Sequence, residues 1–275
     1  MKISPNKSLG QHFLVNAGVV KKICDVVQSL AERGPTGPRA PVIEIGPGPG
    51  ALTEALLERG LRVLAVEIDS RMIEQLETRF KSAVSSGQLR LLRADVLKLD
   101  LEKLFADSEI LDGTVCGNLP YNVGTQIVMK LIEEAPAARS FCFMLQKEVV
   151  ERFIASEGGA EYGIPSVKLA WTSRLLGHFW VKPGSFDPPP KVDSGVFWYR
   201  RLSSAEEGKN SLERKGDYDR ASAYVSKLFQ HRRKMIRATD KRLSQHALGK
   251  CRPQELSPKQ LFELALSLTG EATDE

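Results

Sequence analysis

A glycine-rich loop at residues 44–50 constrains the fold of this chain more than any other feature. Gly46, Gly48 and Gly50 follow a short apolar strand predicted at 41–45 and precede a helix predicted at 51–59. Small residues in that place let the backbone pass close to a ligand at the carboxyl edge of a sheet. The loop therefore predicts a nucleotide-type binding site where the first strand ends.

Strands and helices alternate along the next hundred residues. Strands are predicted at 61–68, 89–94, 114–117 and 141–145, and helices at 70–85, 125–134 and 147–154. Segments 174–181 and 192–202 are predicted as a terminal strand pair with one antiparallel member, and apolar spacing predicts a helix at 13–33. This alternation predicts an α/β fold with a mostly parallel sheet and helices on both faces.

The last quarter of the chain predicts a second, smaller domain. Residues 203–216 are polar, lack apolar periodicity and are predicted to form a linker. Segments 218–246 and 257–268 have helical spacing. We therefore expect a larger α/β domain at 1–202, a linker at 203–216 and a small helical domain at 217–275.

Basic side chains are concentrated in that second domain. Nine Lys and Arg residues and one acid, Asp240, lie between positions 227 and 252 (the bases are Lys227, Arg232, Arg233, Lys234, Arg237, Lys241, Arg242, Lys250 and Arg252). A solvated helix face usually mixes signs, so this bias predicts a surface that meets phosphates, centred on Arg232, Arg233 and Lys234. An ordinary basic helix face is the alternative. The formal charge of +5 permits nucleic-acid binding without diagnosing it.

Several classes of protein are disfavoured by composition. No run of 18 apolar residues is present, so no membrane span is expected, and residues 1–9 have no apolar core typical of a secretory signal. The four cysteines, Cys24, Cys116, Cys142 and Cys251, are scattered without metal-ligand spacing. They predict reduced thiols in the cytoplasm and no metal site.

Two acids are predicted at the ends of the strands after the loop. Glu67 lies about 20 residues further on, where an acid binds ribose hydroxyls, and Asp95 can accept from an adenine amino group. The loop also fits a dinucleotide pattern with Ala51 last, so NAD competes. Pro47 and Pro49 remove N–H groups that a diphosphate needs, and no Tyr-x-x-x-Lys pair is evident, which favours S-adenosylmethionine. Taken singly, each acid could equally be a helix cap or surface residue instead of a ligand contact. Together, at successive strand ends beside the glycine loop, the two acids favour a ligand site.

The tetrapeptide Asn118-Leu119-Pro120-Tyr121 follows another apolar strand. Its carboxamide, fixed turn and aromatic ring suit the edge and face of a planar amino-heterocycle, such as an adenine turned out of its stack. The alternative is a strand-ending turn with a satisfied Asn and a packed Tyr. The glycine loop on the same predicted sheet favours the ligand site.

These motifs, with three others, resemble those of the ribosomal RNA adenine dimethyltransferases, most closely the bacterial small-subunit type. The five ordered motifs occupy residues 7–14, 44–50, 118–121, 143–149 and 186–194. The resemblance implies a class I methyltransferase fold with a seven-stranded, doubly wound sheet. It implies that the domain at 1–202 binds S-adenosylmethionine and is catalytic, and that the helical domain at 217–275 binds RNA. It also implies cofactor contacts from His12, Leu14, Gly46, Gly48, Glu67, Asp95 and Asn118. Some relatives carry Asn where His12 stands; alone, His12 would be a surface residue and Leu14 a core residue.

The resemblance further implies the reaction. S-adenosylmethionine would methylate N6 of two adjacent adenosines in the 3′-terminal hairpin loop of 16S rRNA within an immature small subunit. Asn118 and the Leu119 carbonyl would accept hydrogen bonds from the amine, Tyr121 would stack on the base, and Phe186 would cover its other face. No metal or protein nucleophile is needed, and a monomer is expected.

Four other functions compete with this reading. A large-subunit rRNA adenine methyltransferase conferring antibiotic resistance is disfavoured by Leu119 and by the block at 186–194. A non-catalytic RNA- or DNA-binding factor on the same fold is disfavoured by the intact motifs at 46–50 and 118–121. A DNA adenine methylase is disfavoured weakly by Leu119, and an NAD-dependent oxidoreductase is the most distant alternative.

Overall fold

The computed structural model describes residues 11–32, 41–110, 112–202 and 215–269. The chain divides into two compact units, Met1–Val150 with Leu175–Arg200 and Glu151–Arg174 with Arg201–Glu275. No helix in the described ranges is both long and apolar enough to cross a membrane.

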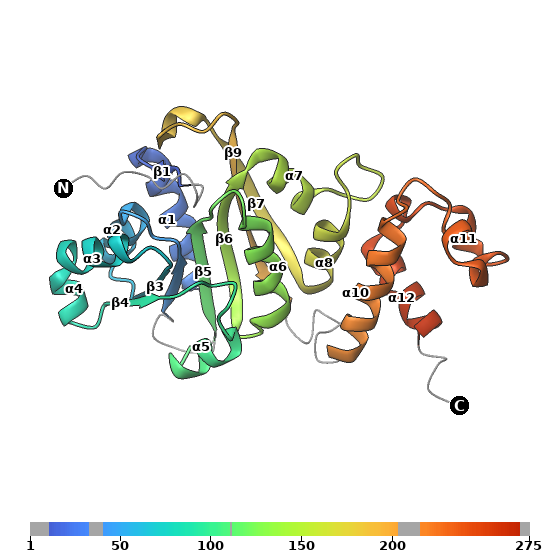
Figure 1. Ribbon diagram of the computed structural model, residues 1–275, viewed down its shortest axis with the longest axis horizontal. Coiled ribbons are helices and arrows are strands. Elements are labelled where there is room, and N and C mark those ends of the chain that lie inside the picture. Colours follow the sequence, from blue (N-terminus) through green and yellow to red (C-terminus); the bar gives the residue numbers. More distant parts are fainter. Residues whose placement is uncertain (1–10, 33–40, 111, 203–214, 270–275) are drawn as a thin grey trace. The chain divides into compact units, whose positions relative to one another are not determined.

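The first unit contains a seven-stranded sheet within the described residues (Figure 1). Its strands are β2 (Val42–Ile45), β3 (Val63–Glu67), β4 (Leu89–Arg93), β5 (Gly113–Asn118), β6 (Ala138–Gln146), β7 (Ser173–Val181) and β9 (Ser194–Arg201), in the order β4-β3-β2-β5-β6-β9-β7. The five strands β4, β3, β2, β5 and β6 run parallel to one another, whereas β9 runs antiparallel to β6. The predicted mostly parallel sheet with an antiparallel member is confirmed.

Strand order explains where a ligand can bind. From β2 the chain winds outward to β3 and β4, then returns to β5 on the other side of β2. Because crossovers between parallel strands are right-handed, this reversal puts helices on opposite faces and opens a crevice at the carboxyl ends of β2 and β5. The helices are α1 (Ala17–Ala31), α2 (Ala51–Glu58), α3 (Ser70–Arg79), α4 (Lys81–Ser85), α5 (Leu101–Asp107), α6 (Gly124–Glu134) and α7 (Lys147–Ile154). Every residue of β2 and β3 is buried, as expected for strands covered on both faces.

The predicted helix at 13–33 is wrong at its start. Asn16 caps α1, its side chain accepting from the Val19 N–H at 3.1 Å, so the helix begins at Ala17. Phe13–Leu14 instead form β1, which pairs antiparallel with β8 (Phe186–Asp187). Residues 7–10, the beginning of the predicted N-terminal motif, lie outside the described residues.

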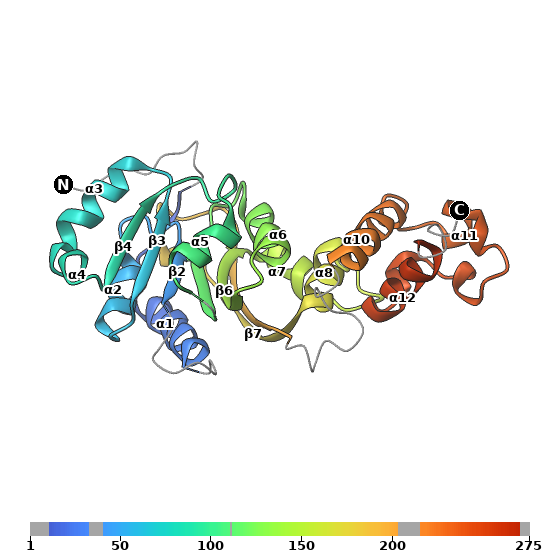
Figure 2. The same ribbon diagram turned by 90° about the horizontal axis from the view of Figure 1, so that it is seen from below.

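The second unit is helical, and it takes in more of the chain than predicted. Its helices α8 (Ile164–Thr172), α10 (Lys215–Phe229) and α12 (Pro258–Thr269) pack together, with α10 beside α12 (Figure 2). Trp171 of α8 donates from its indole nitrogen to the Pro258 carbonyl at 2.7 Å and meets the Phe262 ring edge-on at 5.2 Å. Residues 151–174 therefore join this unit, although the predicted boundary lies at 202. Residues 203–214 of the predicted linker lie outside the described residues.

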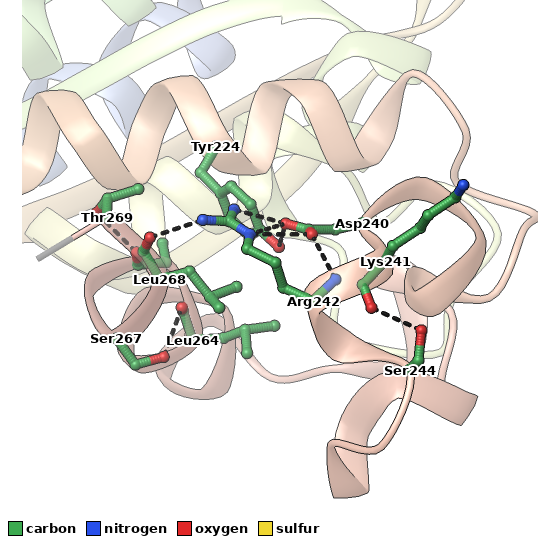
Figure 3. A network of polar contacts seen from close by, with 10 residues as sticks. Tyr224, Asp240, Lys241, Arg242, Ser244, Leu264, Ser267, Leu268 and Thr269 are labelled. Atoms are coloured by element: carbon green, nitrogen blue, oxygen red, sulfur yellow. Dashed lines mark hydrogen bonds and ion pairs between the residues drawn. The ribbon is translucent and has the colours of Figure 1, made fainter. Parts of the chain in front are cut away.

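The predicted helix at 218–246 breaks after Phe229. Beyond it lie the short helix α11 (Ile236–Thr239) and 3₁₀ turns at Lys241–Leu243 and Ala247–Lys250. Figure 3 shows what organises these pieces: Arg242 binds Asp240 and also donates to the Leu268 carbonyl of α12. Side-chain pairing thus replaces the helical hydrogen bonds that the apolar spacing had predicted.

Candidate active site

A pocket opens in the first unit where β2, β3 and β5 end. The residues that line it include the glycine loop, the two predicted acids and the tetrapeptide, with the N-terminal segment from Gln11 to Leu14. Ten residues were predicted for the site, and nine of them line this pocket: His12, Leu14, Gly46, Gly48, Glu67, Asp95, Asn118, Leu119 and Tyr121. Phe186 is not among the lining residues.

The backbone of the glycine loop adopts a conformation that requires glycine. Gly46, Gly48 and Gly50 have φ angles of +67°, +53° and +92°, a region that other L-residues rarely adopt. A Cβ on Gly50 would lie 2.7 Å from both the Leu76 and Phe80 side chains. The loop therefore turns tightly against α3 and keeps its backbone open towards the pocket.

Glu67 organises the loop as well as the pocket. One carboxylate oxygen accepts from the N–H groups of Ile68 and Asp69 at 2.9 and 3.0 Å, and the other accepts from the Gly48 N–H at 3.2 Å. Burial raises the pKa of this carboxyl, and the three N–H donors partly offset the shift. The oxygen that accepts from Gly48 has a second lone pair, so it can also accept from a ligand hydroxyl.

Glu44 is a second buried acid, which the sequence did not single out as a site residue. Its side chain is 1% exposed and accepts from the Thr53 hydroxyl at 2.6 Å. Burial, with a smaller contribution from the Glu67 charge, raises the pKa of Glu44 to about 7. The floor of the pocket thus contains two carboxyl groups whose pKa values are raised, an environment that favours a cationic ligand.

The side of the pocket beyond Glu67 combines an acid with apolar side chains. Asp95 accepts from the Leu97 N–H at 3.0 Å and its side chain remains 28% exposed. Ile68 and Val96 line the pocket next to the two acids, and Ile68 is 48% exposed although it is apolar. An exposed apolar side chain between two acids is suited to the face of a heterocycle. The sequence did contain a sign of these two residues, because Ile68 and Val96 each directly follow a predicted strand-end acid.

Asn118 is held in one orientation by the N-terminal segment. Its Nδ2 donates to the His12 backbone carbonyl at 2.8 Å. The neighbouring Leu119 N–H donates to the Met144 carbonyl of β6 at 3.1 Å, which fixes the turn to the sheet. The Oδ1 end of the carboxamide is consequently the end available to a ligand amine.

Tyr121 is held at its hydroxyl and on one ring face. The hydroxyl is 2.6 Å from the Ser194 hydroxyl of β9. The His12 imidazole stacks on the phenol with 5.2 Å between ring centroids and 28° between planes. Burial raises the pKa of Tyr121, so the phenol stays protonated at neutral pH.

Phe186 lies in the core and not on the pocket wall. Its side chain is 3% exposed and belongs to a cluster that contains Leu14, Met144 and Val181. Phe186 pairs with Leu14 in the β1–β8 ladder, so it anchors the N-terminal segment that carries His12. The sequence motif located the right loop, but its aromatic residue points into the protein.

The three predicted RNA contacts differ from one another. Arg232 donates to the Gln254 side chain at 3.1 Å and to the Ala160 carbonyl at 2.6 Å, so it ties together parts of the second unit. Arg233 and Lys234 are exposed. The basic segment is therefore part structural and part solvent-facing.

Comparisons with known proteins agree with this geometry. Residues 3–260 match the family model described as ribosomal RNA adenine dimethylase. A ribosomal RNA small subunit methyltransferase A from Pseudomonas syringae pv. syringae is 36% identical over 279 residues, covering 98% of this chain and 96% of that protein. The Pseudomonas aeruginosa protein of the same name is 38% identical over 237 residues, covering 86% of this chain and 82% of the relative.

Solved structures share the fold. The crystal structure of a dimethyladenosine transferase from Plasmodium falciparum has a TM-score of 0.72 at 23% identity, covering 94% of this chain and 98% of that chain. The 23S rRNA methyltransferase ErmE has a TM-score of 0.63 at 21% identity, covering 91% and 98%. Both confirm the class I methyltransferase fold.

Proposed function

The chain belongs to the ribosomal RNA adenine dimethylase family, and we propose that it methylates N6 of two adjacent adenosines in the 3′-terminal hairpin loop of 16S rRNA. The donor is S-adenosylmethionine and the product is N6,N6-dimethyladenosine. The observation that carries this proposal is Asn118, which lines the same pocket as the glycine loop and whose Nδ2 is engaged by the His12 carbonyl, so that Oδ1 is left for a ligand amine.

The residues of the pocket fit this cofactor. When bound, S-adenosylmethionine supplies a methyl group on a positively charged sulfur that is a built-in leaving group. Glu67 has one lone pair left for a ribose hydroxyl, on the oxygen that accepts from Gly48, Asp95 can accept from the adenine amine, and Ile68 can cover the ring. Gly46 and Gly48 let the backbone approach closely, and the buried acids favour a cation. His12 and Leu14 close the pocket from the N-terminal side.

Asn118 and Leu119 act on the target amine. The lone pair of adenine N6 is delocalised into the ring, so the amine is a poor nucleophile. Hydrogen bonds to Asn118 Oδ1 and to the Leu119 carbonyl draw the nitrogen towards a tetrahedral geometry and aim its lone pair at the methyl. Positive charge develops on N6 during transfer, and both dipoles stabilise it more in the transition state than in the ground state.

Dimethylation and base binding follow from the same contacts. Each transfer would leave the demethylated cofactor and release one N6 proton to solvent. After the first transfer one N–H remains, so one of the two acceptors stays engaged. Tyr121 stacks on the base, which contributes about 1–3 kcal/mol. A single-stranded loop suits this site because its bases unstack cheaply. Phe186 is assigned to the core and has no place in this scheme.

The second unit supplies the contacts to phosphate. Arg233 and Lys234 are exposed in the basic segment, whereas Arg232 is engaged within the unit. An immature small subunit is the proposed partner, with the protein acting as a monomer in the cytoplasm.

Transfer of tritiated methyl groups tests the proposal directly. The protein is incubated with S-adenosylmethionine and either unmethylated small subunits, their naked 16S rRNA or large-subunit RNA, and the labelled nucleoside is identified. We expect N6,N6-dimethyladenosine in 16S rRNA. Labelling of large-subunit RNA alone, or of no RNA, would overturn the assignment.

A further inference from the structure

Tyr121 meets two partners that the proposed chemistry does not require. Its hydroxyl lies 2.6 Å from the Ser194 hydroxyl, and the His12 imidazole covers one of its faces. Neither partner reaches the target base in the scheme above. Both instead restrict the ring on which the base is proposed to stack.

Ser194 is a fixed anchor. It is the first residue of β9, lies opposite Gln146 of β6 in the antiparallel ladder, and is 0% exposed. Next to it, a Cβ on Gly195 would lie 2.6 Å from the Trp180 ring, so the start of β9 is closely packed. The preceding residue is also held, because the Asp193 carbonyl accepts from the Lys147 N–H at 2.9 Å. The Ser194 backbone is therefore fixed by the sheet, and its hydroxyl can move only by rotation about the Cα–Cβ bond.

His12 is anchored independently of Ser194. Its Nδ1 is 2.8 Å from the Pro188 carbonyl, and its own backbone carbonyl accepts from Asn118. The imidazole is thus held over one face of the phenol while the adjacent carbonyl orients the carboxamide. The opposite face of Tyr121 is the face left for a base.

We propose that Ser194 is a positioning residue for the target adenosine: by holding the Tyr121 hydroxyl, it sets the tilt of the ring that aligns N6 with the methyl group. His12 determines which face of that ring is used. The proposal rests on the function proposed above for the same site. Methyl transfer needs the reacting atoms aligned, and a misplacement of about 1 Å can cost about 100-fold in rate. A phenol released from Ser194 can tilt by that order without leaving the pocket.

A purely structural hydrogen bond predicts a different outcome. Loss of such a bond would lower the unfolding temperature and leave the turnover of the folded enzyme unchanged. Loss of a positioning bond lowers kcat at saturating cofactor while cofactor affinity stays the same. The two roles are therefore separated by kcat and by binding, not by stability.

A double-mutant cycle tests the proposal. Ser194→Ala and Tyr121→Phe each remove the same bond, and Tyr121→Phe leaves β9 intact should the serine variant fold poorly. Turnover on unmethylated small subunits, cofactor affinity by calorimetry and thermal unfolding are measured for the wild type, both single variants and the double variant. Ser140→Ala, at a serine 5% exposed on β6, is the matched control.

We expect each single variant to lower kcat by about 10- to 100-fold, and the double variant to be no slower than either. Cofactor affinity should stay within about twofold of wild type, and Ser140→Ala should keep wild-type kcat. Wild-type kcat in folded Ser194→Ala, or multiplying losses in the double variant, would overturn the positioning role alone. A wild-type protein that methylates no RNA would overturn the proposed function and this inference with it.

Discussion

The Asn118 carboxamide donates to the backbone carbonyl of His12 at 2.8 Å across 106 residues of sequence. This bond joins the N-terminal segment to the end of β5. It also decides which end of the carboxamide faces the pocket, because Nδ2 is already engaged. The proposed acceptor geometry at the target amine therefore depends on a contact with the main chain and not only on the identity of residue 118.

Replacement of Asn118 should lower turnover far more than cofactor affinity. Asn118→Ala removes an acceptor that acts mainly in the transition state, so we expect kcat to fall by about 100- to 1,000-fold. Asn118→Asp keeps an oxygen but cannot donate to the His12 carbonyl, so it should also lose activity. Methyl transfer and cofactor calorimetry on both variants check this. Near-normal turnover in either variant would remove the oriented carboxamide from the mechanism.

Glu44 should make the protein less stable as the pH rises. Its pKa is about 7 in the folded chain against an ordinary 4.5, so the folded state binds a proton that the unfolded state releases in that interval. The free energy of unfolding should therefore fall between pH 4.5 and 7, by up to about 3 kcal/mol, and level off above it. Glu44→Gln should flatten this slope.

Urea unfolding at pH 5.5 and pH 8.5 measures the effect without cofactor. Glu67 also has a raised pKa and remains in the variant, so a residual slope of the same sign is expected. Equal pH dependence in the wild type and in Glu44→Gln would show that Glu44 is ionised in the folded state at both pH values.

The basic segment should separate into RNA-binding and structural residues. Arg233→Ala with Lys234→Ala removes two exposed charges, so the slope of log affinity against log salt should fall by about 1 to 2. Arg232→Ala should instead lower the free energy of unfolding by about 1 kcal/mol, through loss of its bonds to Gln254 and Ala160. RNA binding over a salt series and urea unfolding distinguish the two.

A control for that experiment is the double variant Lys81→Ala and Lys259→Ala. Both lysines are exposed and lie outside the basic segment. This control variant removes the same net charge as the Arg233 and Lys234 variant. An equal change in the salt dependence of RNA affinity would mean that overall charge, and not the basic segment, governs RNA binding.

The sequence located residues whose positions depend on the order of the elements, because the structure brings them together in one pocket. Glycines after a strand, and acids at strand ends, occupy the same edge of any parallel sheet, so the positions of Gly48, Glu67 and Asp95 followed from element order alone. Phe186, which we predicted to cover the base, is buried in the core, and a motif does not reveal which way a side chain points. That direction is set by the β1–β8 pairing across more than 170 residues.

The second unit differs from its predicted structure because apolar spacing does not distinguish a long helix from a set of short turns. Apolar spacing over 218–246 matched a helix, yet α10 ends at Phe229. Ile236 and Leu243 are buried in the core beneath a compact set of turns. They are seven residues apart, a spacing that also occurs on one face of a helix. Trp171 belongs to this unit because it contacts Pro258 and Phe262. The polar composition of 203–216 marks a linker but does not show that a segment before it packs with the second unit.

The Asp240–Arg242 pair should hold those turns in place. Arg242 donates to both Asp240 oxygens and to the Leu268 carbonyl at 3.0 Å, and Tyr224 donates to Asp240 at 3.1 Å (Figure 3). Asp240 is 12% exposed, so Asp240→Asn leaves a guanidinium without its charge partner and should lower the free energy of unfolding by about 1–3 kcal/mol. Tyr224→Phe removes one bond and should cost about 1 kcal/mol.

Acid should weaken the same pair. Arg242, helped by backbone and Tyr224 donors, lowers the pKa of Asp240 to about 2 from an ordinary 3.8. The stabilisation is therefore complete above about pH 4 and is lost as the pH falls towards 2, so the difference between wild type and Asp240→Asn should shrink over that window. Hydrogen exchange of amides in α12 and in the 241–250 turns, measured at pH 5 and pH 3, follows the pair locally. If protection in Asp240→Asn equals that of the wild type at pH 5, the turns are held by the burial of Ile236 and Leu243, and the ion pair contributes nothing measurable.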